Sequence, residues 1–451
     1  MKTLFLVLSR GGLLRTLSES HVIEGLCERD FRVVILTPPS DEQARYASEL
    51  EQYSVVFEPL LTPRPLLVRR ILQELQRAVV FNDTVQAIYR YTIASKRDPS
   101  RILYWPRLYL LPILRFIPYI KPLTRALARA VDPQKEHDAL FTKYRPDLVF
   151  STTPHDESDA AVLKSALRFG TPSICMPKGW DNLPKILFPV KTDRILVWSP
   201  HMKEEAIALQ DYATRDVVIT GAPQFDFYAH PEHRWSREEF ARRHGLDPSK
   251  RIILYGSSGA DMCDEARFLD LLEEYMAERP GLQVLIRPHA GYRDDAARFA
   301  RFAGRPDFRI DRTISQSLTP RSAWDMNPER LLNLYNSLTH ADVCVNVGST
   351  LTIDATLCDT PVINLNFDVD PGVDPMRRSV KRLFETSYIK DIMNCGATWL
   401  VTSKGEFFAA LDETLSDRDA RREQRRRLIE RFAYANDGGA AVRIVDAVTS
   451  I

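Results

Sequence analysis

The chain has 451 residues, enough for two or three domains of ordinary size. Hydrophobic residues make up 44% of it and charged residues 27%, the balance of a globular protein with buried cores. A formal net charge of only +1 argues against a protein that coats nucleic acid.

The six cysteines are scattered and none forms a CxxC pair, so we expect free thiols in a reducing cytosol rather than a zinc site or disulfides. The N-terminal run MKTLFLVLSRGG is apolar like a signal peptide but lacks a small-residue cleavage site, which favours a first strand. No uninterrupted apolar run is long enough to span a membrane. We expect a cytoplasmic protein, with peripheral contact to the inner face of the cytoplasmic membrane.

The first half of the chain alternates short apolar strands with amphipathic helices, which predicts a parallel sheet covered on both faces. The predicted strands span residues 3–9, 32–38, 53–60, 146–154, 172–177, 193–199 and 216–226. The helices between them include residues 16–30, 158–170 and 200–212.

A charged segment that is typical of a linker then leads into a second alternating series. Its predicted strands span residues 251–258, 282–289, 308–312, 342–347 and 360–365, with helices that include 268–280 and 327–341. We therefore predict an α/β protein of two Rossmann-like, doubly wound domains, with the carboxyl ends of both sheets facing a cleft. The predicted divisions are an N-terminal domain at 1–228, a C-terminal domain at 229–430 and a last helix at 431–451 that packs back on the N-terminal domain.

An insertion of about 61–140 interrupts the N-terminal domain. Residues 61–130 hold 13 Lys/Arg against 3 Asp/Glu, a net charge of +10, and are rich in aliphatic and aromatic residues. This mixture is typical of contact with an anionic membrane surface or a lipid-linked acceptor. A helical insertion packed on its own domain, with arginines reaching water, is the alternative. No nucleic-acid-binding motif accompanies the charge, so no nucleic-acid partner is expected.

The stretch NVGSTLTIDATLCDTPVINL joins a predicted strand to a helix through Gly348, Ser349 and Thr350. Free N–H groups and the dipole at a helix start bind anions, and a glycine lets a ligand approach the backbone. Asp354 follows Thr350 by four residues, so both lie on one helix face, where a carboxylate can accept bonds from ribose hydroxyls. Simple capping of the helix by the two hydroxyls is the alternative.

Two other predicted strands of this domain end in polar residues. LIRPHAGY supplies Arg287 and His289, which are suited to phosphate contacts. LYGSSGAD supplies Ser257, Ser258 and Gly259 after the first strand of the domain, where doubly wound folds offer donors to a phosphate. Because the three motifs follow strands of one predicted sheet, we expect them to form one nucleotide-binding site.

The N-terminal domain offers two further turns. Arg10, Gly11 and Gly12 follow its first strand without forming GxGxxG, so we expect a turn that admits a substrate rather than a dinucleotide site. His155 and Asp156 lie in STTPHDESDA after another strand, where either side chain could act as a general base. Capping of the next helix is the alternative for this loop.

The loop MPKGWDNLPK supplies Lys178, Trp180, Asp181 and Asn182 after a strand. A tryptophan beside polar groups suits stacking on a sugar ring at the acceptor side of the cleft. A tryptophan docked on the core is the alternative.

The chain resembles GT-B glycosyltransferases in VVITGAPQFD before the linker and in GSTLTIDATLCDTPVINL of the second domain. KGWDNL, IRPH and the terminal NDGGAAVRI resemble the bacterial surface-polysaccharide (capsule and O-antigen) branch, near UDP-GlcNAc 2-epimerases, Kdo transferases and CDP-glycerol glycerophosphotransferases. The resemblance implies a nucleotide-activated sugar in the C-terminal domain, a glycan or lipid-linked acceptor in the N-terminal domain, and closure between them.

Carried onto this chain, the resemblance implies that Gly348, Ser349 and Thr350 hold the diphosphate, supported by Arg287 and His289. The family usually has Glu where this chain has Asp354. Neither a cofactor nor a metal is expected, because helix N-termini and basic side chains stabilise the leaving diphosphate. The acids of DVDPGVDP at 368–375 are more typical of a turn-rich loop than of a metal site.

The resemblance implies a glycosyltransferase that moves a sugar from a nucleotide donor to a bacterial surface glycan. Direct displacement would use His155 or Asp156 as the base, whereas a retaining reaction would lean on the donor phosphate; the sequence leaves both open. The alternatives are a non-hydrolysing UDP-sugar 2-epimerase, a transferase of a polyol phosphate from a CDP donor, and a binding protein without turnover. The insertion favours a transferase, since an epimerase of a soluble sugar has no use for it.

Overall fold

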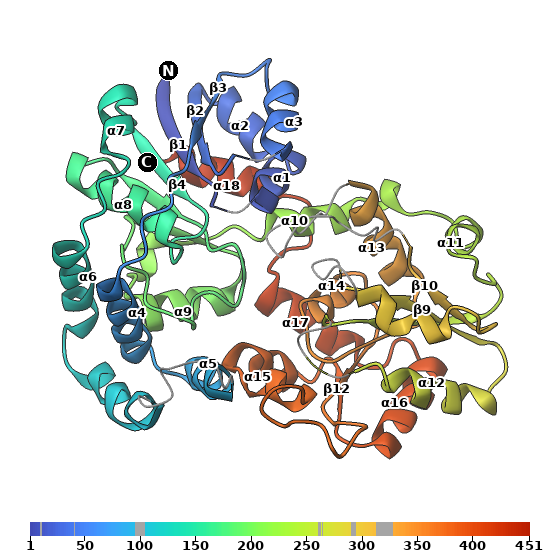
Figure 1. Ribbon diagram of the computed structural model, residues 1–451. Helices are drawn as coiled ribbons and strands as arrows, with labels where there is room; N and C mark the ends of the chain where they lie inside the picture. Colours follow the sequence, from blue (N-terminus) through green and yellow to red (C-terminus); the bar gives the residue numbers. More distant parts are fainter. Residues whose placement is uncertain are drawn as a thin grey trace. The chain divides into compact units, whose positions relative to one another are not determined.

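The computed structural model describes residues 1–9, 11–39, 41–94, 104–259, 263, 265–289, 295–312 and 328–451 (Figure 1). The chain divides into two compact units. Unit 1 comprises 1–89, 97–226 and 431–451, and unit 2 comprises 90–96 and 227–430.

Unit 1 is built on a seven-stranded parallel sheet with strand order β3-β2-β1-β4-β5-β6-β7. Its strands are β1 (Lys2–Val7), β2 (Phe31–Thr37), β3 (Val55–Pro59), β4 (Leu148–Ser151), β5 (Ser173–Cys175), β6 (Arg194–Val197) and β7 (Val217–Ile219). The strands are short apolar runs because helices cover both faces of the sheet, and Phe5, Val7, Val34 and Val149 are fully buried.

The helices of unit 1 follow its strands in alternation. They are α1 (Gly11–Glu19), α2 (Val22–Glu28), α3 (Asp41–Glu49), α7 (Asp138–Tyr144), α8 (Glu157–Phe169), α9 (Pro200–Gln210), α10 (Pro223–Asp226) and α18 (Ala440–Thr449). Helix α18 begins where the Asp226 carboxylate accepts bonds from the backbone N–H groups of Ala440 (3.0 Å) and Ala441 (2.9 Å). It packs on α2, where a Cβ at Gly25 would lie 3.0 Å from Val445. The end of the chain thus belongs to unit 1.

The insertion lies between β3 and β4. Its elements are α4 (Leu67–Val79), α5 (Asp83–Ala94), the short helical segments η2 (Pro106–Leu110) and η3 (Leu111–Phe116), and α6 (Ile120–Val131). Elements α4, η3 and α6 pack against one another, and η2 packs against η3. No helix in the described part of the chain is both long enough and apolar enough to cross a membrane.

Unit 2 is built on a six-stranded parallel sheet with strand order β10-β9-β8-β11-β12-β13. Its strands are β8 (Arg251–Gly256), β9 (Leu282–Arg287), β10 (Phe308–Ile310), β11 (Val343–Asn346), β12 (Val362–Leu365) and β13 (Trp399–Val401). The longer helices and η segments around it are α11 (Arg237–His244), α12 (Phe268–Ala277), η7 (Asp295–Phe302), α13 (Pro328–His340), α14 (Leu351–Leu357), η8 (Val380–Glu385), α15 (Ser387–Asn394), α16 (Lys404–Ser416) and α17 (Arg422–Phe432).

Both strand orders reverse direction at one point, between β1 and β4 in unit 1 and between β8 and β11 in unit 2. Such a reversal parts the connecting loops and marks where doubly wound folds bind ligands, at the carboxyl ends of the strands. The prediction of two Rossmann-like, doubly wound domains is confirmed.

Candidate functional site

The candidate site of unit 2 lies at the carboxyl ends of three strands, with β8 paired to β9 on one side and to β11 on the other. Ser257 follows β8, Arg287 ends β9 and Gly348 follows β11 by two residues. The fold therefore brings the three predicted motifs to one edge of one sheet.

The turn after β11 is folded by Asn346, a fully buried residue at the end of that strand. Its Oδ1 accepts bonds from the N–H of Gly348 (2.8 Å), the hydroxyl of Thr352 (3.2 Å) and the amide of Asn364 (3.0 Å). Gly348 has φ +81°, and a Cβ there would lie 3.0 Å from the ring of Phe384. Only glycine meets both constraints without strain.

The two hydroxyls of this turn, on Ser349 and Thr350, make few hydrogen bonds within it. Ser349 is half-buried and its hydroxyl accepts a bond from the N–H of Leu351 (3.3 Å). Thr350 is exposed, and its side chain makes no capping bond to α14. Helix α14 has only seven residues, so the hydroxyls of Ser349 and Thr350 matter more for binding an anion than the helix dipole does.

Asp354 lies one turn into α14, as predicted from its spacing, but its carboxylate has an unpredicted partner. The hydroxyl of Tyr228 donates to Asp354 Oδ1 at 3.0 Å. Burial raises the pKa of Asp354 to about 7, while the Tyr228 hydrogen bond and the charge of Arg287 act in the opposite direction. Near neutral pH this group is therefore poised between the carboxylate and the neutral acid.

Arg287 is buried, and its guanidinium is held inside unit 2. Its Nη1 donates to Asp311 Oδ2 (2.6 Å), just after the neighbouring strand β10, and to Asn333 Oδ1 (2.7 Å) on α13. The predicted phosphate contact of Arg287 would require this buried pair to rearrange. His289 lies two residues further on, and burial lowers the pKa of its imidazole, which favours the neutral form.

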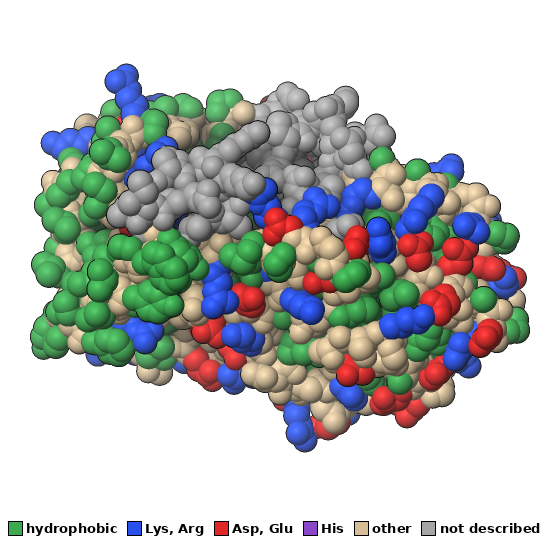
Figure 2. Space-filling view, turned by 60° about the horizontal axis from the view of Figure 1, so that its bottom comes forward, with side chains coloured by type: hydrophobic (Ala, Val, Ile, Leu, Met, Phe, Trp, Pro, Cys, Tyr) green, Lys and Arg blue, Asp and Glu red, His purple; other side chains and the backbone are tan. Residues whose placement is uncertain are grey.

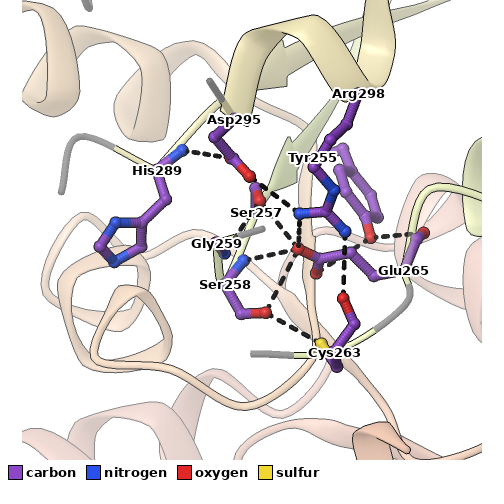
Figure 3. Close-up of polar contacts among 9 residues, drawn as sticks. All are labelled: Tyr255, Ser257, Ser258, Gly259, Cys263, Glu265, His289, Asp295 and Arg298. Carbon is purple, nitrogen blue, oxygen red and sulfur yellow. Dashed lines mark hydrogen bonds and ion pairs between the residues drawn. The ribbon is translucent and has the colours of Figure 1, made fainter. Parts of the chain in front are cut away.

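The turn after β8 is organised by Glu265, a fully buried carboxyl group that sequence reasoning missed (Figure 3). Its Oε1 accepts bonds from the hydroxyl of Ser257 (2.8 Å), the N–H of Ser258 (2.9 Å) and the hydroxyl of Ser258 (3.2 Å). The N–H of Gly259, at φ +102°, donates to Ser257 Oγ (3.1 Å). The hydroxyls predicted to bind phosphate therefore bind Glu265 in this structure.

Arg298 joins this turn to the one after β9. Its guanidinium lies 3.3 Å from Glu265 and 2.8 Å from Asp295, and Asp295 Oδ2 accepts the N–H of His289 at 2.7 Å (Figure 3). The two turns are thus parts of one hydrogen-bonded network with a buried centre.

In unit 1 the corresponding buried acid is Asp159, beside the switch point of the sheet. Its Oδ2 accepts bonds from the hydroxyl of Ser151 (2.7 Å) and the N–H of Thr153 (2.9 Å), which fixes the turn after β4. Burial raises the pKa of Asp159 to about 7. Across the switch point Gly11 and Gly12 open α1, while Arg10 lies outside the described residues.

The two predicted bases of the PHDES loop have different roles. Asp156 is the N-cap of α8, and its Oδ1 accepts the N–H of Ser158 at 3.1 Å, which is the capping alternative. His155 is half-buried against Phe188, with 6.2 Å between ring centroids. Burial, followed by the charges of Lys178 and Lys185, lowers the pKa of His155 to about 4. His155 is therefore neutral at neutral pH, the form that can accept a proton.

The loop after β5 lies close to His155, since the charges of its Lys178 and Lys185 act on that imidazole. The tryptophan of this loop is not exposed to solvent. Trp180 is only 3% exposed, so it packs in the core and offers no face to a sugar; the stacking role predicted for it is corrected. Asn182 is also buried and donates to Asp181 (2.9 Å), which pairs with Lys185. Lys178 is half-exposed.

The acids of the 368–375 segment are used within unit 2. Asp368 accepts bonds from the hydroxyl of Ser379 and the N–H of Val380, and Asp370 pairs with Arg267 at 3.1 Å. Within the residues that the structure describes, no group of three His, Cys, Asp or Glu side chains is arranged to hold a metal ion.

No protein-family model matches this chain, and no curated protein matches its sequence. Solved structures do match its fold. A putative UDP-N-acetylglucosamine 2-epimerase from Listeria monocytogenes has a TM-score of 0.56 at 11% identity, covering 100% of this chain and 96% of that one. The UDP-GlcNAc 2-epimerase from Neisseria meningitidis, bound to UDP-GlcNAc, has a TM-score of 0.56 at 10% identity, with 100% of both chains covered.

A glycotransferase of kitacinnamycin has a TM-score of 0.52 at 12% identity, covering 100% of this chain and 98% of that one. Together these likenesses show that the chain has the fold of the GT-B superfamily, which confirms the fold that its resemblance implied. At such low identities they establish the fold and not the reaction.

We predict that Gly348→Ala destabilises unit 2 by about 1–3 kcal/mol, because alanine is strained at positive φ and its Cβ would press on Phe384. Gly281→Ala is the matched control: it has φ +87° in the same unit and open space around it. Urea unfolding of both variants separates the backbone strain from the contact. Equal losses in the two variants would contradict a role for Phe384.

We predict that Asp159 makes unit 1 less stable as the pH rises. Burial raises the pKa of Asp159 to about 7 in the folded protein. The contribution of its protonated form to the free energy of unfolding is therefore fully present when the pH is below the ordinary pKa of an aspartate, and it is lost as the pH rises through 7. From pH 5 to pH 8 the wild type should lose about 2–3 kcal/mol of unfolding free energy relative to Asp159→Asn.

Urea unfolding at both pH values measures this difference. Asp147→Asn is the control, since it removes an exposed carboxylate that accepts only the N–H of Thr3 among the described bonds (2.7 Å). Parallel pH curves for the wild type and Asp159→Asn would contradict the assignment.

Proposed function

We propose that the protein is a glycosyltransferase that moves a sugar from a nucleotide-activated donor to a hydroxyl group of a bacterial surface glycan. The observation that carries the proposal is the convergence of the turns after β8, β9 and β11 on one edge of the sheet in unit 2. Neighbours of the same fold include structures with UDP and with UDP-GlcNAc, which supports a nucleotide-sugar donor.

The donor would be held by unit 2. Gly348 lets the diphosphate approach the backbone, and the accessible hydroxyls of Ser349 and Thr350 can donate to its oxygens. Asp354 has one carboxylate oxygen on Tyr228, and the other can accept a ribose hydroxyl when the group is ionised. Binding of a ribose should therefore pull the pKa of Asp354 down from about 7.

In direct displacement the oxygen of the acceptor hydroxyl attacks the anomeric carbon of the sugar. The bond between that carbon and the phosphate oxygen breaks, and its electron pair leaves with the nucleoside diphosphate. The acceptor proton passes to a base, for which His155 is the candidate because it follows β4 at the edge of the sheet and is unprotonated at neutral pH. Its pKa of about 4 makes it a weaker base than a free imidazole.

The second candidate function is epimerisation of a UDP-sugar, favoured by the likeness to UDP-GlcNAc 2-epimerases. Incubation with UDP-sugars, with and without an acceptor glycan, separates the two, with the sugar followed by NMR and the nucleotide by chromatography. Release of nucleoside diphosphate only when acceptor is present supports the transferase. Epimerised donor without acceptor supports the epimerase, and release of CMP from CDP-glycerol indicates a polyol-phosphate transferase.

We predict that His155→Gln lowers kcat of transfer by about 10²–10⁴-fold and leaves donor affinity unchanged, because the variant removes only the proton acceptor. His137→Gln is the matched control: His137 is a buried imidazole of unit 1 whose pKa is likewise lowered to about 4, and its Nε2 accepts the N–H of Leu61. Steady-state kinetics and calorimetric titration with the donor measure the two quantities. Full activity of His155→Gln would point to a retaining reaction that needs no protein base.

A further inference from the structure

The insertion of unit 1 buries two of its arginines and exposes many of its apolar side chains. Arg69 on α4 is buried and donates to Asp132 at 2.8 and 3.1 Å. Arg125 on α6 is buried and donates to the backbone carbonyls of Phe188 (3.2 Å) and Gln210 (2.7 Å). The Arg69 bonds therefore join α4 to the residue after α6, whereas the Arg125 bonds fasten the insertion to the rest of unit 1.

The outer faces of the same helices are apolar at helical spacing. On α4 Leu67 and Ile71 are 74% and 61% exposed, and on α6 Leu123 and Leu127 are 62% and 43% exposed. Residues four apart share one helix face, so each helix presents an apolar stripe to solvent. Amphipathic helices of a globular protein normally turn that stripe to the core.

Aromatic side chains extend this surface over the segments between the helices, where Tyr109 on η2 and Phe116 on η3 are 64% and 72% exposed. Of the 23 large hydrophobic side chains that are exposed in the described residues, 14 lie within residues 61–131. Figure 2 shows hydrophobic side chains gathered on the left of the view, the side on which α4 and α6 lie in Figure 1. A patch of this extent is typical of an interaction surface. We call it the insertion surface, formed by the exposed residues of α4, η2, η3 and α6.

The exposed charges on the four elements of the insertion surface are positive. Arg70, Arg115 and Arg129 are exposed, whereas the one acid on these four elements, Glu74, is half-buried and paired with Arg77 and Arg107. A second copy of the chain would oppose arginine with arginine in a symmetric dimer. An anionic lipid surface, by contrast, complements both the arginines and the apolar stripes.

We propose that the insertion surface docks on anionic lipid bilayers, with α4 and α6 lying in the plane of the interface and their leucines among the acyl chains. The aromatic residues suit the headgroup level, where tyrosine and tryptophan gather in membrane proteins. Docking would place the enzyme beside an acceptor that is anchored in the membrane. Only this statement about the acceptor rests on the proposed function. Binding to lipid follows from the surface itself.

Flotation of the full chain with phosphatidylcholine vesicles, with and without phosphatidylglycerol, tests the proposal. The protein should float with the anionic vesicles and stay in solution with the neutral ones. The pair Arg70→Gln and Arg129→Gln should weaken binding by roughly fivefold per arginine. The pair Leu67→Ser and Leu123→Ser should weaken it by at least about tenfold per residue.

Leu167→Ser with Val442→Ser is the matched control, since these exposed apolar residues lie on α8 and α18 of the same unit. This control should float like the wild type, and thermal melting verifies that every variant is folded. Absence of flotation, or equal flotation of the Leu67/Leu123 variant and the control, would overturn the proposal. A dimer in size-exclusion chromatography that the Leu67/Leu123 variant abolishes would overturn it in favour of a second copy.

Transfer to a water-soluble acceptor separates this proposal from the proposed function. A variant that no longer floats and still transfers sugar in solution supports docking as a distinct property. Flotation without any transfer of sugar would contradict the proposed function and would still support docking on lipid.

Discussion

Two buried carboxyl groups, Asp159 in unit 1 and Glu265 in unit 2, each hold a turn that carries candidate site residues of its own unit. Each lies beside the point where its sheet changes strand order, and each collects hydroxyl and N–H donors from the turn above it. A carboxyl group is costly to bury unless its oxygens are bonded, so the turns and the acids require one another. Loss of either acid would leave several buried donors without partners.

The same interaction limits what the turns can do in the absence of substrate. The hydroxyls of Ser257 and Ser258 are directed at Glu265, and the guanidinium of Arg287 is directed at Asp311. A phosphate would have to compete with carboxylates already in place, whereas Ser349 and Thr350 face no such competitor among the bonds described. Within unit 2 the turn after β11 is therefore the best prepared for an anion.

Much of the fold could be predicted from the sequence because alternation of apolar strands and amphipathic helices is a local signal. The Gly348 turn was also predictable, since a glycine between a strand and a helix marks a close approach of the backbone. The partners of the site residues were not predictable in this way. Tyr228 and Asp354 are 126 positions apart, and Glu265 stands in a stretch of acids, DMCDEARF, where nothing distinguishes the buried one.

Trp180 and Asn346 also show that the sequence alone does not give the tertiary contacts of a site residue. The polar neighbours of Trp180 indicated an exposed loop, but the tertiary packing buries the ring. Asn346 ends an apolar run and attracted no functional interpretation, yet its side chain folds the turn through three bonds. A polar residue that closes a buried strand is a signal that could have been used.

The inward arginines and outward leucines of the insertion have a consequence for how reactants would meet. A protein held on a bilayer by this surface and an acceptor anchored in the same bilayer encounter each other in two dimensions, at an effective concentration set by the area they share. Affinity for the acceptor could then be weak in solution and still sufficient at the membrane. The nucleotide sugar would remain the one reactant that arrives from bulk solution, so the rate of transfer would depend on its concentration there.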